Sequence, residues 1–198
     1  MSEISASVVK ELRQKTGAGF MDCKRALSES GGDVDAAADL LRKRGVELAA
    51  KKAGRATSQG WIGSYVHSNG RIGVLVELNC ETDFVARNDK YQVFLKDLCM
   101  HVAAMNPLAL TPEDLDPELV EKERSIYADQ VKDKPDGVRE KIAEGKLNKY
   151  FSEVCLLHQP FVRDDKKTVQ EVLTEQIATI GENMSIRRFV RLEMGQGG

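Results

Sequence analysis

Apolar residues in the first 45 positions recur every three or four residues, the spacing of a helix with one buried face. Three such segments follow one another, and glycines separate them, with the third expected to end at Gly45. Helices this short cannot each bury an apolar face alone, so we expect a compact three-helix bundle. The apolar positions are Val8, Val9 and Leu12 in the first segment, Met21, Cys23, Ala26 and Leu27 in the second, and Val34, Ala37, Leu40 and Leu41 in the third.

A basic, alanine-rich segment at residues 46–55 follows the bundle and includes Lys51 and Lys52. Its composition is typical of a helical linker, which predicts a domain boundary near residue 55. The expected first domain is therefore the bundle with its linker, residues 1–55, and the second domain is residues 56–198.

Beyond residue 60 the pattern changes from helical to alternating, which indicates strands. Residues 61–67 and 72–78 flank Asn69-Gly70, a pair typical of a tight hairpin turn. The second run is rich in β-branched residues, so we expect it to be central in the sheet. A last alternating run is expected to pair with the hairpin and to place on one face Ile186, Arg188, Val190, Leu192 and Met194.

Two segments of the second domain have the apolar spacing of long helices. One begins near Asp89 and carries Tyr91 on its apolar face. The other is opened by a capping box of Thr168 and Glu171 and ends at Gly181. Helices and alternating strands together predict an α+β domain in which helices cover a small antiparallel sheet.

A charged region between these helices has few apolar positions. It begins at Asp116-Pro117, is interrupted at residues 134–137, and continues as a second helical pattern, so residues 117–150 are expected to form an antiparallel helical hairpin. Its small apolar content favours a protruding arm that makes interactions. Residues 152–162 are expected to be extended.

Composition limits the classes of partner. The chain has 198 residues, 41% hydrophobic, with a formal net charge of −2 and a pI near 6.0. A general binder of nucleic acid or membrane surfaces needs an excess of Lys and Arg, so we expect neither activity. Four widely spaced cysteines, no signal-peptide pattern and no apolar run of about 20 residues predict a reduced, cytoplasmic protein without a membrane span.

Motifs for chemistry are weak. Cys99 and His101 lie two positions apart on an expected helix and so diverge, and the spacing of Cys155 and His158 is not typical of a zinc site. Cys80 is the best candidate for a nucleophile, but it ends an apolar strand, where a cysteine is usually a buried hydrophobe. No phosphate-binding glycine loop is present. The residues therefore favour a binding protein over an enzyme.

The segment at residues 80–89 joins the central strand to the first long helix and is expected to be a strand-to-helix corner. Phe84 and Val85 lie there among polar residues. An aromatic in such a place can turn inward under the corner or offer itself to a partner. From the residues alone, burial of Phe84 is the ordinary outcome.

Several long stretches, taken together and in order, resemble bacterial elongation factor Ts. The resemblance runs nearly from end to end and is therefore more specific than any short motif. The stretches are residues 9–13, 16–24, 49–53, 71–77, 80–88, 145–147, 159–162 and 181–188. One departure is Phe20, where many members of the family have Met.

The resemblance implies a guanine-nucleotide exchange factor for the translational GTPase EF-Tu. It also implies a ubiquitin-associated-like N-terminal bundle, an α+β core and a helical hairpin. Longer members carry two core halves, whereas this chain shows one, so the resemblance implies a homodimer that binds two GTPases. It requires neither a bound cofactor nor covalent chemistry.

The exchange element of the family is matched here by Thr82, Asp83, Phe84 and Val85. In the family this segment enters beside the magnesium site of the GTPase, so Phe84 would be the wedge and would be at least partly exposed in the free protein. Secondary contacts are expected at Met21, Lys24, Lys51, Lys52 and His67. For the lysines, solvated positions without a partner are an equal alternative, and Met21 could instead belong to the core.

Two other classes of function are open at this point. The bundle of residues 1–50 could act as an adaptor that only tethers a protein partner, in which case Phe84 would not matter. A thiol or hydrolytic enzyme using Cys80 or Cys99 is the third class.

Overall fold

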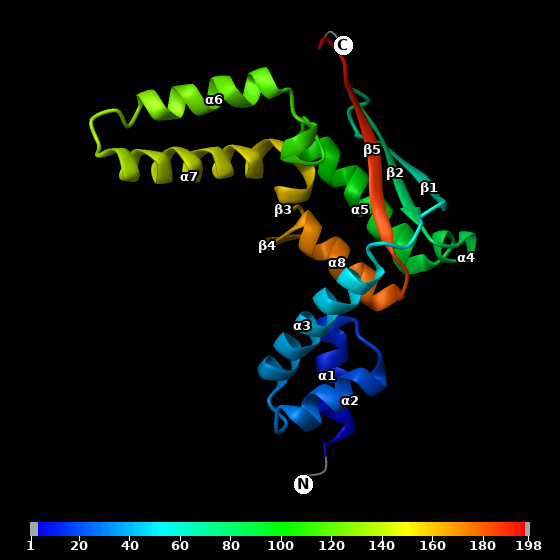
Figure 1. Cartoon of the computed structure of the whole chain (residues 1–198). Coiled ribbons are helices and arrows are strands. Elements are labelled where there is room, and N and C mark those ends of the chain that lie inside the picture. Colours follow the sequence, from blue (N-terminus) through cyan, green and yellow to red (C-terminus); the bar gives the residue numbers. More distant parts are fainter. Residues whose placement is uncertain (1–3, 197–198) are drawn as a thin grey trace. The chain divides into compact units, whose positions relative to one another are not determined.

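The computed structural model describes residues 4–196 (Figure 1). Within this range, Asp136 is described by its backbone alone. These residues form two compact units. The first contains residues 4–60, 79–91 and 173–185, and the second contains residues 61–78, 92–172 and 186–196. The predicted boundary near residue 55 falls inside the first unit and stays a prediction. Residues 1–3 and 197–198, at the outer ends of the predicted domains, lie outside the described residues.

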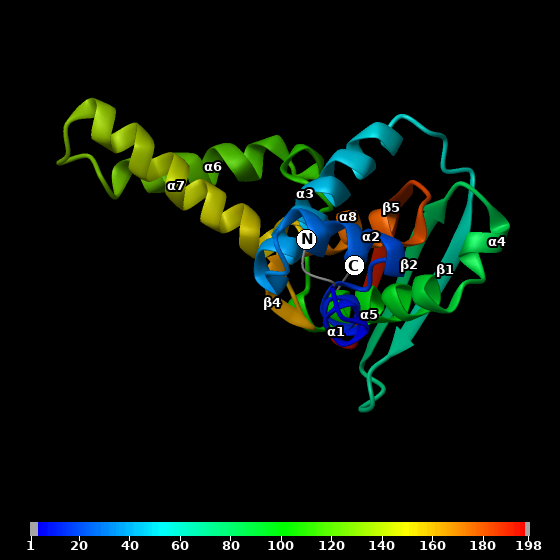
Figure 2. The same ribbon diagram turned by 90° about the horizontal axis from the view of Figure 1, so that it is seen from below.

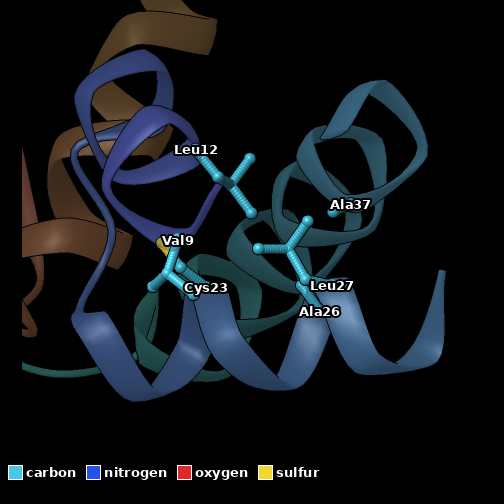
Figure 3. Packing of buried hydrophobic residues seen from close by; sticks show 6 residues of the cluster. All are labelled: Val9, Leu12, Cys23, Ala26, Leu27 and Ala37. Atoms are coloured by element: carbon cyan, nitrogen blue, oxygen red, sulfur yellow. The ribbon is translucent and has the colours of Figure 1, made fainter. Parts of the chain in front are cut away.

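The first unit begins with the predicted three-helix bundle. Buried side chains from all three helices meet at its centre, as Figure 3 shows. The helices are α1 (Ala6–Thr16), α2 (Phe20–Glu29) and α3 (Val34–Lys52). The central residues are Val9, Leu12, Cys23, Ala26, Leu27 and Ala37.

Local capping explains where these helices begin and end. The Ser5 hydroxyl accepts a hydrogen bond from the Val8 N–H, and one Asp33 carboxylate oxygen accepts from two N–H groups at the start of α3. Gly17 ends α1 with a φ of 67°, a left-handed conformation that glycine adopts without strain. The predicted glycine stop after α1 is confirmed.

The predicted end of the third helix at Gly45 is wrong. Helix α3 continues through Gly45 to Lys52, so the helical conformation predicted for the basic segment is confirmed up to Lys52, but as part of this helix. A Cβ atom at Gly45 would lie 3.2 Å from the Cβ of Ala178 in α8 (Val169–Ile180). Gly45 therefore permits close packing of two helices instead of ending one.

The main sheet has three strands in the order β1 (Gln59–Val66), β2 (Ile72–Cys80) and β5 (Met184–Glu193). The hairpin between β1 and β2 is closed by the hydrogen bond from His67 N to Ile72 O, and Gly70 adopts a φ of 68°. The Met194 N–H donates to Arg71 O, which joins the end of β5 to the start of β2 and makes this pair antiparallel too. The predicted central position of the second strand is confirmed.

Helix α5 (Asp89–Met105) covers one face of the sheet in the second unit. Gly63 allows this approach, because a Cβ atom there would lie 2.6 Å from Leu95 Cγ and 2.9 Å from Cys99 Sγ. The opposite face carries exposed apolar side chains. We call this set the outer sheet face: Ile62, Val66, Leu75, Val190 and Leu192.

The predicted alternation of the last strand agrees with its contacts. Arg188, on the same side as Val190 and Leu192, pairs with Glu77 of β2, with 2.7 Å between Nε and Oε2. The guanidinium of Arg191, from the opposite side of the strand, reaches Ala103 O on α5, the covered side of the sheet. Burial is uneven along the strand, because Ile186 is buried whereas Val190 and Leu192 are 49% and 69% exposed.

Helices α6 (Pro117–Asp129) and α7 (Asp136–Val154) form the predicted hairpin and lie side by side in both views (Figures 1 and 2). The predicted extended conformation of residues 152–162 is wrong for most of its length. Helix α7 continues to Val154 because Phe151 and Val154 pack against a small cluster of Ala109, Leu115 and Cys155.

The remaining chain of the second unit is short and irregular. It contains two 3-10 turns and a two-stranded antiparallel sheet, and it leads to α8, whose capping box is formed by Thr168 and Glu171 as predicted. Within residues 4–196, every helix is too short or too polar to cross a lipid bilayer. The elements are η1 (Pro112–Asp114), η2 (Leu156–His158), β3 (Pro160–Phe161) and β4 (Asp164–Thr168).

Candidate functional site

The candidate site is the corner between β2 and α5, where the chain forms one helical turn, α4 (Asp83–Ala86). Thr82 is the N-cap of this turn. Its backbone is extended, and its hydroxyl accepts a hydrogen bond of 3.3 Å from the Val85 N–H. The predicted strand-to-helix corner is confirmed, and the Thr82 side chain is the local reason that the chain turns here.

Phe84 and Val85 have opposite environments on this turn. The Phe84 side chain is 80% exposed, whereas Val85 is 9% exposed and Ala86 is buried beside it. The expectation from the resemblance that Phe84 is exposed is confirmed, and burial, the ordinary outcome for such a residue, is wrong. Val85 and Ala86 anchor the turn, and Phe84 extends from it into solvent.

Asp83 is also exposed and points a carboxylate out of the same turn. It forms an ion pair with Arg87, whose Nη2 lies 3.3 Å from Asp83 Oδ2. Both side chains are about 70% exposed. An exposed pair of this kind contributes little to stability, so Asp83 can exchange Arg87 for another partner at small cost.

Glu182, in the loop between α8 and β5, holds the start of this turn. Its two carboxylate oxygens accept from the Thr82 N–H at 3.0 Å and from the Thr82 hydroxyl at 2.7 Å. Both residues belong to the first unit. The start of this turn is therefore fixed by a residue 100 positions away.

Asn183 connects the same loop to the residue before Thr82 and to the end of α3. Its N–H donates to Glu81 Oε1 at 2.6 Å, and its side-chain amide donates to Arg55 O at 2.8 Å. The N–H of Asn183, and then the charge of Arg55, hold the pKa of the Glu81 carboxyl below its ordinary value. The loop at residues 181–183 is therefore hydrogen-bonded both to the residue before Thr82 and to the chain that follows α3.

Lys52 contributes to this attachment. It is 8% exposed, and its ammonium donates to Gly181 O. The sequence predicts one of two roles for Lys52, a contact with a partner or a position in solvent. The buried side chain fits neither of them. Lys52 supports the corner from within.

Cysteine chemistry is disfavoured at the corner. Cys80 is fully buried, with its Sγ 3.1 Å from Thr82 O, and burial raises the pKa of its thiol. Burial also raises the pKa of Cys99 and of Cys155 to about 11. These thiols are protonated near neutral pH and are poor nucleophiles. Within the described part of the chain, no group of three or more His, Cys, Asp or Glu side chains could hold a metal ion.

The other predicted contact residues lie away from the corner in the sequence. Met21 is 65% exposed, next to the half-exposed Phe20, so it is not a core residue. Lys24 and Lys51 are exposed. His67 is exposed at the end of β1, where its Nδ1 lies 3.0 Å from the Tyr65 hydroxyl.

The sequence interpretation missed Glu182 and Asn183 as site residues. Both lie in the stretch 181–188 that resembles the family, but nothing in their local pattern connects them to Thr82. One feature of the sequence could have pointed to Glu182. It follows Gly181, the glycine that ends α8, and it has no capping role in that helix. Such a residue can serve as a cap for another segment.

Comparisons with known proteins identify the family of this chain. The family model described as elongation factor TS matches residues 2–176. The chain is 55% identical to elongation factor Ts of Geotalea uraniireducens, over 98% of this chain and 91% of that protein. It is 55% identical to the protein of the same name from Nitratidesulfovibrio vulgaris over 97% of each, and 54% identical to that of Oleidesulfovibrio alaskensis over 98% of this chain and all of the relative. The chain therefore belongs to the elongation factor Ts family of translation factors.

Proposed function

We propose that this protein is a guanine-nucleotide exchange factor for the GTPase EF-Tu and acts in the cytoplasm during polypeptide elongation. Membership of the family supports the general role. The single observation that supports the site is Phe84, which is 80% exposed on a turn anchored by buried Val85. An aromatic that is held in place but has no packing partner of its own is suited to insertion into another protein.

The proposed mechanism is displacement. The segment Thr82–Val85 enters beside the magnesium site of the GTPase, where Phe84 acts as a wedge and Asp83 engages the adjacent helix. Magnesium and the phosphate-binding loop supply much of the affinity for nucleotide, so moving them weakens GDP binding without any contact to the base. No bond is made or broken, and the buried, protonated thiols agree with a factor that is not an enzyme.

Linkage makes the process reversible. If the factor lowers the affinity of the GTPase for nucleotide, nucleotide lowers the affinity for the factor by the same ratio. GTP present in excess therefore binds the emptied GTPase and releases the factor. The factor then acts on another GTPase.

Replacing the wedge tests this function directly. Phe84→Ala should slow GDP release from EF-Tu by about thirtyfold, since losing a buried interface aromatic typically costs 2 kcal/mol or more. The measurement is release of fluorescent GDP at saturating factor. Because Phe84 packs against little of its own chain, the melting temperature should be unchanged.

Leu108→Ala is the matched control, because Leu108 is also an exposed apolar residue, at 58%, but lies outside the corner. It should release GDP at the wild-type rate. A Phe84→Ala variant that exchanges as fast as the wild type would rule out the wedge.

An adaptor function has one observation in its favour, the exposure of Phe20 and Met21 at the start of α2. In that case a Phe20→Asp, Met21→Asp double variant should abolish binding to EF-Tu while Phe84→Ala has no effect. Under the exchange mechanism the double variant weakens binding, but Phe84→Ala still lowers the maximal rate.

We propose that a second copy of the chain covers the outer sheet face, so that two copies serve two EF-Tu molecules. Its five apolar side chains are between 49% and 69% exposed and lie on neighbouring strands. So many large apolar side chains exposed on one face of a sheet are uncommon on a monomer. A symmetric dimer would bury the same surface on both copies.

A further inference from the structure

We propose that Glu182 is a positioning residue for the exchange element, fixing the start of α4 and thereby the direction in which Phe84 points. The inference rests on the proposed exchange function and extends it to a residue outside the Thr82–Val85 motif. The contacts that carry it lie within the first unit.

The hydrogen bonds at Thr82 form a connected chain. Its hydroxyl donates its one hydrogen to Glu182 Oε1 at 2.7 Å, which leaves a lone pair to accept from the Val85 N–H at 3.3 Å. The second oxygen of Glu182 accepts from the Thr82 N–H at 3.0 Å. Glu182 therefore fixes both the backbone and the rotamer of the residue that caps α4.

Helix α4 depends on such support, because it has only four residues. A single turn is not stable alone, since forming it fixes several dihedral angles for one hydrogen bond. Burial of Val85 and Ala86 holds one side of the turn. The side that leads into Phe84 is held through Thr82, and thus through Glu182.

The residues on either side of Glu182 are hydrogen-bonded to other segments. Gly181 has a φ of 89°, and its carbonyl oxygen accepts a hydrogen bond from the Lys52 ammonium. Asn183 donates to the Glu81 carboxylate and to the Arg55 carbonyl oxygen. A carboxylate on a loop attached in this way can hold its partner in one orientation. The acceptor thus lies on a supported segment rather than on a free side chain.

Because the bonds between Glu182 and Thr82 are exposed to solvent, Glu182 can position Phe84 without contributing much to the stability of the protein. The bonds of Thr82 to Glu182 are at the surface, where water can replace them. Removing the carboxylate should therefore change the stability of the protein little. The direction of Phe84, which has no other packing to fix it, should become less defined.

The first test is Glu182→Ala in the GDP-release assay with EF-Tu. We expect a maximal exchange rate lowered about tenfold, with the concentration of factor at half-maximal rate changed less than threefold, because most of the binding surface is intact. Glu182→Gln keeps the size and one acceptor oxygen, so its rate should be intermediate. A wild-type maximal rate for both variants would overturn the proposal.

Glu171→Ala is the matched control, because the Glu171 carboxylate makes the same two contacts at another helix start. It accepts from the Thr168 N–H at 2.8 Å and from the Thr168 hydroxyl at 3.3 Å. The lost bonds are at the surface at both sites, so each variant should lose little stability, but only Glu182→Ala should lower the maximal exchange rate. Equal rate losses in the two variants would overturn the positioning role.

A double-mutant cycle with Phe84→Ala identifies the route of the effect. If Glu182 acts through Phe84, Glu182→Ala should have no further effect on the rate once Phe84 is absent. The same tenfold loss in both backgrounds would overturn the proposal. If Phe84→Ala alone exchanges normally, the exchange mechanism itself fails. If Phe84→Ala is slow and Glu182→Ala is normal, only the role of Glu182 fails.

Discussion

Phe84 and Val85 are adjacent apolar residues in one polar segment, and only the structure separates their roles. The residues alone favour burial of Phe84, and the family resemblance favours exposure. The structure gives 80% exposure for Phe84 and 9% for Val85. The direction of each side chain depends on how the turn is anchored, which neighbouring residues in the sequence do not specify.

His101 is a second residue whose role comes from contacts distant in the sequence. It is fully buried, and its Nδ1 accepts a hydrogen bond of 3.2 Å from the Val162 N–H. Its Nε2 must then carry the hydrogen and donate to Gln159 Oε1 at 2.9 Å. The Gln159 amide donates in turn to Glu153 O, which fixes its orientation. The neutral ring is thus part of a satisfied buried network.

Burial of the ring predicts a pH dependence of stability. Burial lowers the pKa of His101 below its ordinary value, and the bond to Gln159 opposes this in part. The unfolded chain therefore binds a proton at His101 more readily, so the free energy of unfolding should fall as pH drops below about 6.5. Urea denaturation at several pH values between about 7.5 and 5.5 measures this loss.

His101→Gln removes the titrating group while keeping a donor and an acceptor. The variant is expected to be less stable at neutral pH, because the ring packs against Phe161, but it should lose less stability on acidification. Parallel pH profiles for the two proteins would contradict the assignment.

At the scale of elements, the glycines show that tertiary packing can override the local tendency of glycine to end a helix or a strand. Gly17 ends a helix, as its position in the sequence predicts, whereas Gly45 lies within α3 and Gly63 within β1. Sequence patterns identify a glycine as a possible stop. They do not show that another element approaches it closely.

Gly63→Ala should be strongly destabilising. The added Cβ would lie 2.6 Å from Leu95 Cγ, and the sheet and α5 would have to separate. We expect a loss of about 1–3 kcal/mol in the free energy of unfolding, the usual cost of overpacking a core. Thermal or urea unfolding, followed by circular dichroism, measures the change.

Gly145→Ala is the opposite case and serves as the control. Gly145 lies inside α7 with no atom within 4 Å of an added Cβ. The substitution should stabilise the protein by about 0.5–1 kcal/mol, because alanine favours the helix more than glycine does. Equal effects of the two substitutions would show that the packing of Gly63 on α5 is not limiting.

At the scale of the whole molecule, the outer sheet face predicts self-association. Leu192→Lys places a charge where the proposed dimer buries Leu192, which is 69% exposed in the single chain. Burying an unpaired ammonium is costly, so the variant should be monomeric at concentrations where the wild type is dimeric. Analytical ultracentrifugation should give twice the chain mass of 21.9 kDa for the wild type and the single mass for the variant.

Val93→Lys is the control for this experiment, because Val93 is 61% exposed but lies on α5 and not on the outer sheet face. It should remain dimeric. A monomeric wild type, or a Leu192→Lys variant that stays dimeric, would contradict the assignment of this face.

The sequence by itself determined the features that depend on a few neighbouring residues. The cap at Thr168, the stop at Gly17 and the hairpin at Asn69-Gly70 belong to this group. Each arises from hydrogen bonds or backbone freedom within about four positions, so the local pattern is sufficient. The class of fold follows from these elements and from their apolar faces.

Only the tertiary structure decided the features that join distant parts of the chain. It placed Glu182 on Thr82 across 100 positions and buried Lys52 against the Gly181 carbonyl across 129. It also left the outer sheet face exposed. Such contacts depend on which segments meet after folding, and the spacing of residues along a chain does not contain that information.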